Sequence, residues 1–185
     1  PSSVLGAIDM RPLDVLKMYM SLGRAGEMVN PLFFVDLYQD GKNLVDEHPE
    51  WIEVKKVAEP NASAQLVAIM ERVLTHGTGQ SLRAYTTDCL LAGKSGTTSD
   101  YKDSWFAGLS PQMTGVAWLG DDDNRSTGYS GSSGAAQIWG PLTGNLCKEY
   151  PRTEWKLPEG FGFEVKDDVR ILKEEREKLR GILAE

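Results

Sequence analysis

Apolar side chains recur at helical intervals in three segments of the chain. The first segment covers residues 12–23 and begins with Pro12, a residue suited to the first turn of a helix. The second covers about residues 61–76. The third covers about residues 135–147 and contains Pro141, which is expected to bend it. The pattern therefore predicts three amphipathic helices.

Strand signals lie between these helices. Residues 91–97, 105–109 and 114–119 are separated by short polar turns, which predicts three consecutive antiparallel strands. Residues 31–47 carry the turn pair Asp40-Gly41 between two apolar runs, so this segment is predicted to be a β-hairpin. The order of the elements predicts an α/β fold of the α+β type, in which helices flank an antiparallel sheet.

The chain is expected to divide into residues 1–150, which contain all of these elements, and a C-terminal portion, residues 151–185. Residues 151–166 are predicted to be an extended connector. Residues 167–183 are acidic at first and basic later, which predicts a charged helix that complements the helix dipole. The sequence opens at Pro1 without an initiator methionine, so we expect it to be a piece of a longer protein.

Composition narrows the range of functions. The net charge of -7 argues against a nucleic-acid partner, because nucleic-acid binding requires a basic face. No apolar run approaches the ~18 residues that a membrane span needs, so this portion is expected to make no membrane contact. The two histidines have no partner spacing that suggests a metal site or a serine-histidine pair, and no cofactor is expected. Cys89 and Cys147 are expected to be unpaired, packed thiols rather than a disulfide.

Residues 93–98 form the strongest chemical signal in the sequence. They read Gly-Lys-Ser-Gly-Thr-Thr and place an ammonium and three hydroxyls on one short extended segment. A phosphate-binding loop would need a glycine where Asp88 stands and a helix after the lysine, and the sequence offers neither. A chance occurrence on an exposed strand is the second interpretation.

The third interpretation is the substrate strand of a serine acyltransferase that uses lysine chemistry. Lys94 would place a positive charge near a nucleophilic hydroxyl and favour its ionised form. Ser95 and Thr97 would donate hydrogen bonds to a substrate carboxylate, each contributing about 1.5–3 kcal/mol. Gly96 would leave room for an acyl substrate along the strand edge. The backbone N–H of Thr97 would supply one donor to an oxyanion hole.

Three stretches in order carry a resemblance to a known family. They are residues 93–108, residues 115–124 and residues 129–139, and a Gly-Thr-Gly turn at residues 77–79 precedes them. This combination resembles the carboxyl-terminal part of the transpeptidase domain of class A, bifunctional penicillin-binding proteins. The resemblance covers about residues 1–145.

Two motifs of that family are missing from the sequence. S-x-x-K occurs once, at Ser99 to Lys102, inside the third motif and in a predicted turn, where chance explains it best. The middle motif, serine-x-asparagine, does not occur. We therefore expect the nucleophilic serine to lie in the missing N-terminal part of the transpeptidase domain, and the isolated chain to be inactive. We also expect one of the three strands to keep an unpaired edge that the missing segment, or another chain, completes.

The resemblance implies part of a peptidoglycan D,D-transpeptidase that cross-links stem peptides and binds β-lactams. It implies a catalytic role for Lys94 and substrate binding by Ser95, Gly96, Thr97 and Thr98. It further implies an upstream glycosyltransferase domain, a membrane anchor and a location on the periplasmic face of the inner membrane. Ser95 departs from the threonine more common in this class, which keeps the hydroxyl but loosens its rotamer.

Two alternatives stay open at this point. One is a non-catalytic binding or scaffold module of the same fold. The other is a D,D-carboxypeptidase or β-lactamase. The presence of S-x-x-K and serine-x-asparagine upstream in the parent gene would favour an enzyme over a scaffold.

Overall fold

The fold is described from a computed structural model, over residues 8–85, 89–150, 152–166 and 169–174. Its helices are α1 (Pro12–Gly23), α2 (Leu44–Glu47), α3 (Pro60–His76) and α4 (Ala135–Glu149), with short 3-10 helices η2 (Pro49–Trp51), η3 (Gln80–Tyr85) and η4 (Ser99–Tyr101). Its strands are β1 (Glu27–Val29), β2 (Tyr38–Gln39), β3 (Lys42–Asn43), β4 (Val54–Lys56), β5 (Ala92–Thr97), β6 (Ser104–Leu109), β7 (Thr114–Leu119), β8 (Phe161–Lys166) and β9 (Val169–Glu174). The three predicted helices and three predicted strands of the body are confirmed.

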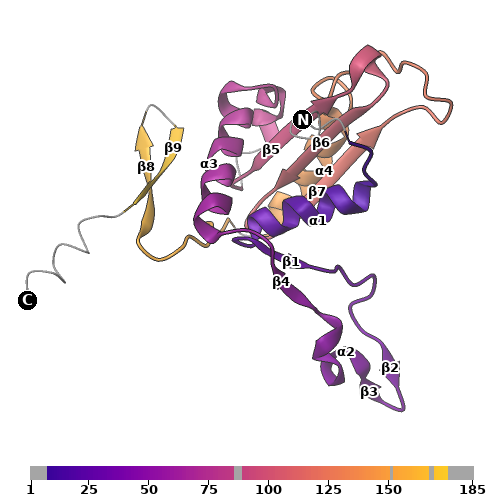
Figure 1. The fold of residues 1–185 in the computed structure, drawn as a ribbon, viewed down its shortest axis with the longest axis vertical. Helices are drawn as coiled ribbons and strands as arrows, with labels where there is room; N and C mark the ends of the chain where they lie inside the picture. The colour runs from indigo at the N-terminus through magenta and orange to yellow at the C-terminus, as the bar shows by residue number, and fades with distance from the viewer. Residues whose placement is uncertain (1–7, 86–88, 151, 167–168, 175–185) are drawn as a thin grey trace, which may run out of the picture.

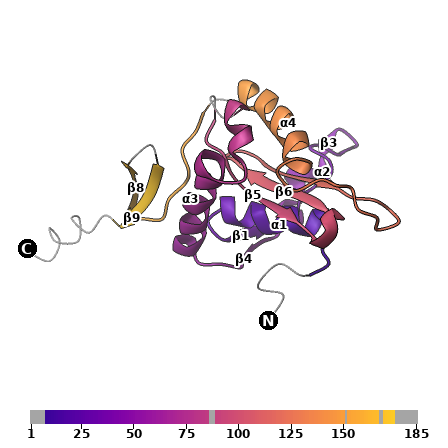
Figure 2. The same cartoon turned by 90° about the horizontal axis from the view of Figure 1, so that it is seen from above.

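The central sheet is antiparallel, with strand order β5-β6-β7. Its register aligns Gly93 with Gly108 and Gly108 with Gly115, so three glycines lie side by side across one face. Trp139 of α4 fills the space above two of them, and a Cβ at Gly108 would lie 2.3 Å from its ring. Helix α4 therefore packs closely on this face (Figure 2).

Helices α1 and α3 complete the body. Figure 2 shows α1 on the face of the sheet opposite α4, while α3 runs beside the outer strand β5. Val67 and Met70 of α3 share a buried cluster with Ala92 and Leu109 of the sheet. This packing fixes β5 along its length and leaves its far end, from Lys94 onward, at the surface.

A long arm extends from the body, and the prediction for this region was only partly right. Strands β1 and β4 form a two-stranded ribbon, and the short β2–β3 pair closes around the predicted turn at Asp40-Gly41 (Figure 1). The long strands expected within residues 31–47 are absent from the described chain, which instead forms two-residue strands followed by α2. Phe33 and Val35 are 84% and 85% exposed, so these two side chains add no packing that would hold a longer ladder.

The C-terminal portion also differs from its prediction. Residues 161–166 and 169–174 pair as the antiparallel hairpin β8–β9, whereas we predicted a connector and a charged helix. The rest of the predicted helix, residues 167–168 and 175–183, lies outside the described residues. The β-branched residues Val169 and Ile171 favour a strand, and Leu172 lies opposite Phe163 in the partner strand.

The hairpin is held on α3 by a buried polar cluster. Trp155 is buried, and its Nε1 donates to Oε1 of Glu71 at 2.6 Å. Arg170 lies with its Nε 3.7 Å from Oε2 of Glu71, and its Nη2 donates to Glu154 at 2.7 Å. Burial raises the pKa of the Glu71 carboxyl above its usual range, and the Trp155 and Arg170 contacts oppose that rise. Both views place α3 between this hairpin and the sheet (Figures 1 and 2).

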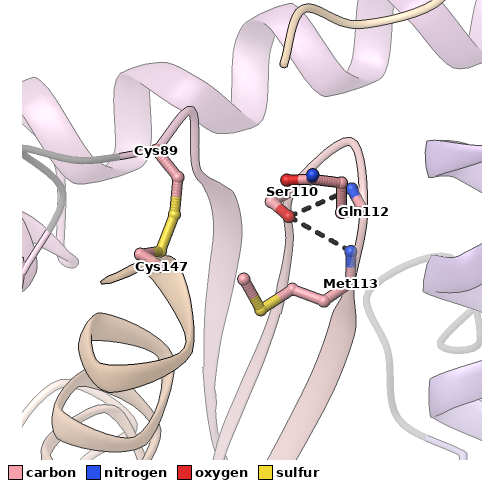
Figure 3. Close-up of a disulfide and its surroundings, with 5 residues drawn as sticks. All are labelled: Cys89, Ser110, Gln112, Met113 and Cys147. Carbon is pink, nitrogen blue, oxygen red and sulfur yellow. Dashed lines mark hydrogen bonds between the residues drawn. A yellow bond between two sulfur atoms is a disulfide. The ribbon is translucent and has the colours of Figure 1, made fainter. Parts of the chain in front are cut away.

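The prediction that both cysteines are unpaired thiols was wrong. Cys89 and Cys147 form a disulfide with their Cα atoms 5.6 Å apart, within the usual range for such bridges. Figure 3 shows the bridge beside the β6–β7 turn, joining the segment before β5 to the last turn of α4. A sequence separation of 58 hides this proximity, which exists only after α4 has packed across the sheet.

Candidate active site

Strand β5 presents its polar residues on two faces. In an antiparallel strand, neighbouring side chains point to opposite faces and directly paired residues share a face. Ser95 pairs with Phe106 and Thr97 pairs with Ser104, so both hydroxyls lie on the side of the sheet that carries α4. Lys94 lies on the other side. The first residues of β5, Ala92 and Gly93, are buried, and Lys94 and Thr97 are exposed.

The Ser95 hydroxyl is held by a turn that follows α3. Its Oγ lies 2.6 Å from Oγ1 of Thr78, a distance typical of a hydrogen bond between hydroxyls. The glycines on either side of Thr78 both donate their N–H groups to the carbonyl oxygen of Val73. The structure therefore brings the predicted residue Ser95 together with the predicted Gly-Thr-Gly turn.

The Thr97 hydroxyl is held by the loop before α4. Oγ1 of Thr97 accepts a hydrogen bond from the N–H of Gly131 at 2.9 Å, which leaves its own proton to be donated elsewhere. A Cβ at Gly131 would lie 2.5 Å from the carbonyl oxygen of Gly96, so only glycine allows this approach. The loop is tied down by Ser104, whose buried Oγ donates to the carbonyl oxygen of Ser130 at 2.7 Å.

Lys94 is exposed, and its Nζ donates to the carbonyl oxygen of Ser95 at 2.6 Å. This contact holds the ammonium against the edge of β5 instead of letting it extend into solvent. The positive charge therefore lies next to the two-hydroxyl segment, where it favours a nearby anion. Its expected approach to a nucleophilic serine stays a prediction.

Thr98 has a structural partner. Its Oγ1 donates to Oδ2 of Asp103 at 3.0 Å and accepts from the N–H of the same residue at 2.7 Å. Oδ1 of Asp103 accepts from the indole of Trp118 at 3.0 Å, which fixes the β5–β6 turn to β7. The predicted contact of Thr98 with substrate stays a prediction. Ser99, the first residue of the chance S-x-x-K match, is exposed in η4 within this same turn.

Sequence reasoning predicted no positioning role for the three residues that hold the hydroxyls, Thr78, Ser104 and Gly131, although it identified the turn that contains Thr78. Thr78 and Gly131 each had a detectable signal, since a side chain flanked by two glycines and a Gly-Ser-Ser-Gly run both suggest close backbone approach. Ser104 had none, because a single serine in a strand is uninformative without its partners.

The comparisons with known proteins identify the family. The chain matches the penicillin binding protein transpeptidase domain family over residues 2–143. It therefore belongs to that family, and the resemblance to the class A penicillin-binding proteins is confirmed.

Particular relatives support this assignment. Penicillin-binding protein 1B of Haemophilus influenzae is 36% identical over 140 residues, which is 75% of this chain and 18% of the relative. Penicillin-binding protein 1B of Vibrio cholerae is 33% identical over 168 residues, covering 88% of this chain and 21% of the relative. This chain thus spans about a fifth of these relatives' length.

A solved structure supports the fold. The crystal structure of penicillin-binding protein 1A from Haemophilus influenzae superposes with a TM-score of 0.76 at 19% identity, covering 91% of this chain and 31% of that chain. The expected α/β fold with an antiparallel sheet is confirmed by this match. No helix in the described ranges has the length and apolar character that crossing a bilayer requires.

Proposed function

We propose that this chain supplies the substrate strand of a peptidoglycan D,D-transpeptidase. One observation carries the proposal: Ser95 and Thr97 place two hydroxyls on one face of β5, two residues apart, with only Gly96 between them. Two hydroxyl donors on one face at this spacing suit a carboxylate, which has two acceptor oxygens. The C-terminal carboxylate of a stem peptide, or the carboxylate of a β-lactam, is the ligand that fits.

In the proposed reaction, a serine outside this chain attacks the carbonyl carbon between the two D-alanines of a stem peptide. The tetrahedral intermediate collapses with release of D-alanine, which takes up one proton, and leaves an acyl-enzyme. An amine of a second stem peptide then attacks the acyl carbon and forms the cross-link, the acyl–oxygen bond breaks, and the proton that the amine loses returns to the serine oxygen. Lys94 acts as the electrostatic and proton-relay partner of that serine, because its ammonium favours the ionised hydroxyl. The isolated chain, which lacks the serine, forms no acyl-enzyme.

The remainder of the transpeptidase domain is the proposed partner of β7 and α4. Between these two elements lies a groove of about 350 Å³ whose lining is mainly apolar. Trp118, Ile138 and Leu142 line it and are 42%, 52% and 61% exposed. A further strand could pair with the backbone N–H and C=O groups at the open edge of β7. Its apolar side chains would cover the groove between β7 and α4.

We also propose that the parent protein is anchored in the inner membrane, carries an upstream glycosyltransferase domain and places this domain in the periplasm. The disulfide between Cys89 and Cys147 supports the location, because such bridges persist in oxidising compartments. The family and the relatives' names support the general reaction class.

The proposal is tested with a fluorescent penicillin and intact-mass measurement. We expect the full-length protein to gain one penicillin mass, and the 185-residue chain to gain none. In the full-length protein, Lys94→Met should slow acylation by a factor on the order of 100, the loss typical of one charge-stabilising group. Lys102→Met is the matched control, since it removes the lysine of the chance S-x-x-K match and should acylate at the wild-type rate.

Three outcomes would contradict the proposal. An adduct on a serine of the isolated chain would show that this sequence holds a nucleophile. A full-length protein without an adduct would favour a scaffold module. Rapid hydrolysis of the adduct, or release of D-alanine without cross-linking, would favour a β-lactamase or a D,D-carboxypeptidase.

A further inference from the structure

The Gly-Thr-Gly turn at residues 77–79 takes no part in the transpeptidation proposed above. Close packing requires glycine at position 77, because a Cβ there would lie 2.8 Å from Cα of Val73; a Cβ at Gly79 would make a tight contact, 3.3 Å from the Val73 carbonyl oxygen. That oxygen accepts the N–H groups of both glycines, at 3.1 and 3.0 Å. The turn is therefore pinned to the end of α3, and Thr78 is the one side chain that it presents.

Thr78 is directed at Ser95. Oγ1 of Thr78 and Oγ of Ser95 are 2.6 Å apart, although the two residues are 17 positions apart in sequence. Thr78 also lines a shallow hollow of about 480 Å³, together with Ser132, Ser133 and Gln137. The hydroxyl pair therefore lies at the surface, within reach of a ligand on β5.

When a carboxylate ligand is bound, the number of available protons decides which hydroxyl, Thr78 or Ser95, donates the hydrogen bond between them. The Ser95 hydroxyl has one proton to donate, and a carboxylate only accepts hydrogen bonds. Ser95 must therefore donate its hydrogen bond to the carboxylate. Thr78 must then donate to Ser95. A hydroxyl that receives such a bond is polarised and becomes a better donor itself.

Thr78 also compensates for the side chain of Ser95. Serine lacks the β-branch that restricts the χ1 angle of threonine, so its Oγ samples more rotamers. A fixed donor 2.6 Å away selects one of them. Threonine is itself β-branched, so the donor is stiff as well as pinned at its backbone.

We propose that Thr78 is a positioning residue that holds and polarises the Ser95 hydroxyl for the substrate carboxylate. This inference rests on the proposed function, because it requires that Ser95 receive a carboxylate. It predicts that Thr78 acts on recognition of that group and not on the stability of the domain.

The test uses the full-length protein and two probes, a penicillin and its methyl ester. The ratio of their acylation rate constants measures how strongly the site recognises a free carboxylate. We expect Thr78→Val to lower this ratio about 3- to 10-fold, the loss typical of one hydrogen bond. Thr78→Ser, which keeps the donor, should stay within about twofold of wild type.

Two further variants separate positioning from structure. Thr75→Val is the matched control, because it removes a hydroxyl at the same end of α3 that bonds to the Arg72 carbonyl oxygen and to His76. Its ratio should equal that of wild type. Adding Ser95→Thr to Thr78→Val should restore most of the ratio, because the added methyl fixes the rotamer that Thr78 had selected.

The outcomes distinguish this inference from the proposed function. If wild type forms no adduct with the penicillin, the proposed function fails. If wild type forms the adduct and Thr78→Val keeps the wild-type ratio, the function stands and the role of Thr78 is overturned. If Thr78→Val yields too little folded protein, as judged by thermal melting, Thr78→Ala replaces it, and an unchanged ratio in that variant overturns the inference equally.

Discussion

We expect the disulfide between Cys89 and Cys147 to contribute strongly to the free energy of unfolding. Replacing both cysteines by alanine removes the cross-link without placing hydroxyls in the apolar cluster around them, where the two residues are 4% and 3% exposed. The bridge closes a loop of 58 residues, and the loss of loop entropy from the unfolded chain for that length corresponds to about 4 kcal/mol at 25 °C. Loss of the bridge should therefore remove a large fraction of the stability of a domain of this size.

The assay is urea unfolding of the 185-residue chain under oxidising and reducing conditions. With a denaturant dependence of about 2 kcal/mol per molar urea, a loss of about 4 kcal/mol lowers the midpoint by about 2 M. Each single cysteine variant should lose nearly as much as the double variant, because either substitution breaks the same bond. Reduction of the wild type should bring it to the midpoint of the double variant.

A nearby substitution supplies the control. Ser110 accepts hydrogen bonds from the N–H groups of Gln112 and Met113 in the β6–β7 turn, beside the bridge in Figure 3. Ser110→Ala weakens that turn and leaves the sulfurs in place, so its effect should be the same in oxidised and reduced protein. A midpoint shift below about 0.5 M for the double cysteine variant, or additive losses in the single variants, would refute the reasoning.

Two further predictions concern other contacts. Because burial raises the pKa of Glu71, the unfolded chain ionises before the folded one as pH rises, so Glu71 should contribute more to stability at about pH 4 than at about pH 7. The charged groups near this carboxyl are Arg170, Glu154 and Arg152, and Glu71→Gln should remove this slope from urea midpoints measured across that range; a slope unchanged in the variant would contradict the assignment. Gly131→Ala places a Cβ 2.5 Å from the Gly96 carbonyl oxygen, so it should lower the penicillin acylation rate of the full-length protein at least about 10-fold. Acylation of this variant at the wild-type rate would contradict the prediction, because it would show that the loop before α4 can move without loss of activity.

The sequence predicts those parts of this fold that depend on local pattern. The helices at residues 12–23 and 61–76 and the three strands that follow have clear periodicity, and the structure places them within one or two residues of the prediction. The helix prediction was wrong for residues 169–174, because their charge order resembles that of a helix while they pair with the preceding strand at Phe161–Lys166. Pairing with the neighbouring strand β8 decided the structure of these residues.

In the candidate site, too, the residues on one strand could be predicted from the sequence, whereas their partners from other segments could not. The predicted residues lie together on the end of β5 that reaches the surface, as their sequence order requires: Lys94, Ser95, Gly96 and Thr97. Their positioning partners come from segments 17 and 34 residues away, and no local pattern contains such a contact. The disulfide was missed for the same physical reason, since only the packed position of α4 brings its two sulfurs together.

The arm built on β1 and β4 offers a practical consequence. Its tip, at the Asp40-Gly41 turn, is connected to the body by the β1–β4 ribbon and lies far from β5 in Figure 1. A fluorophore or an affinity epitope inserted there would report on the whole protein in cells while leaving the hydroxyl-bearing strand undisturbed. The molecule thus provides its own attachment point for imaging.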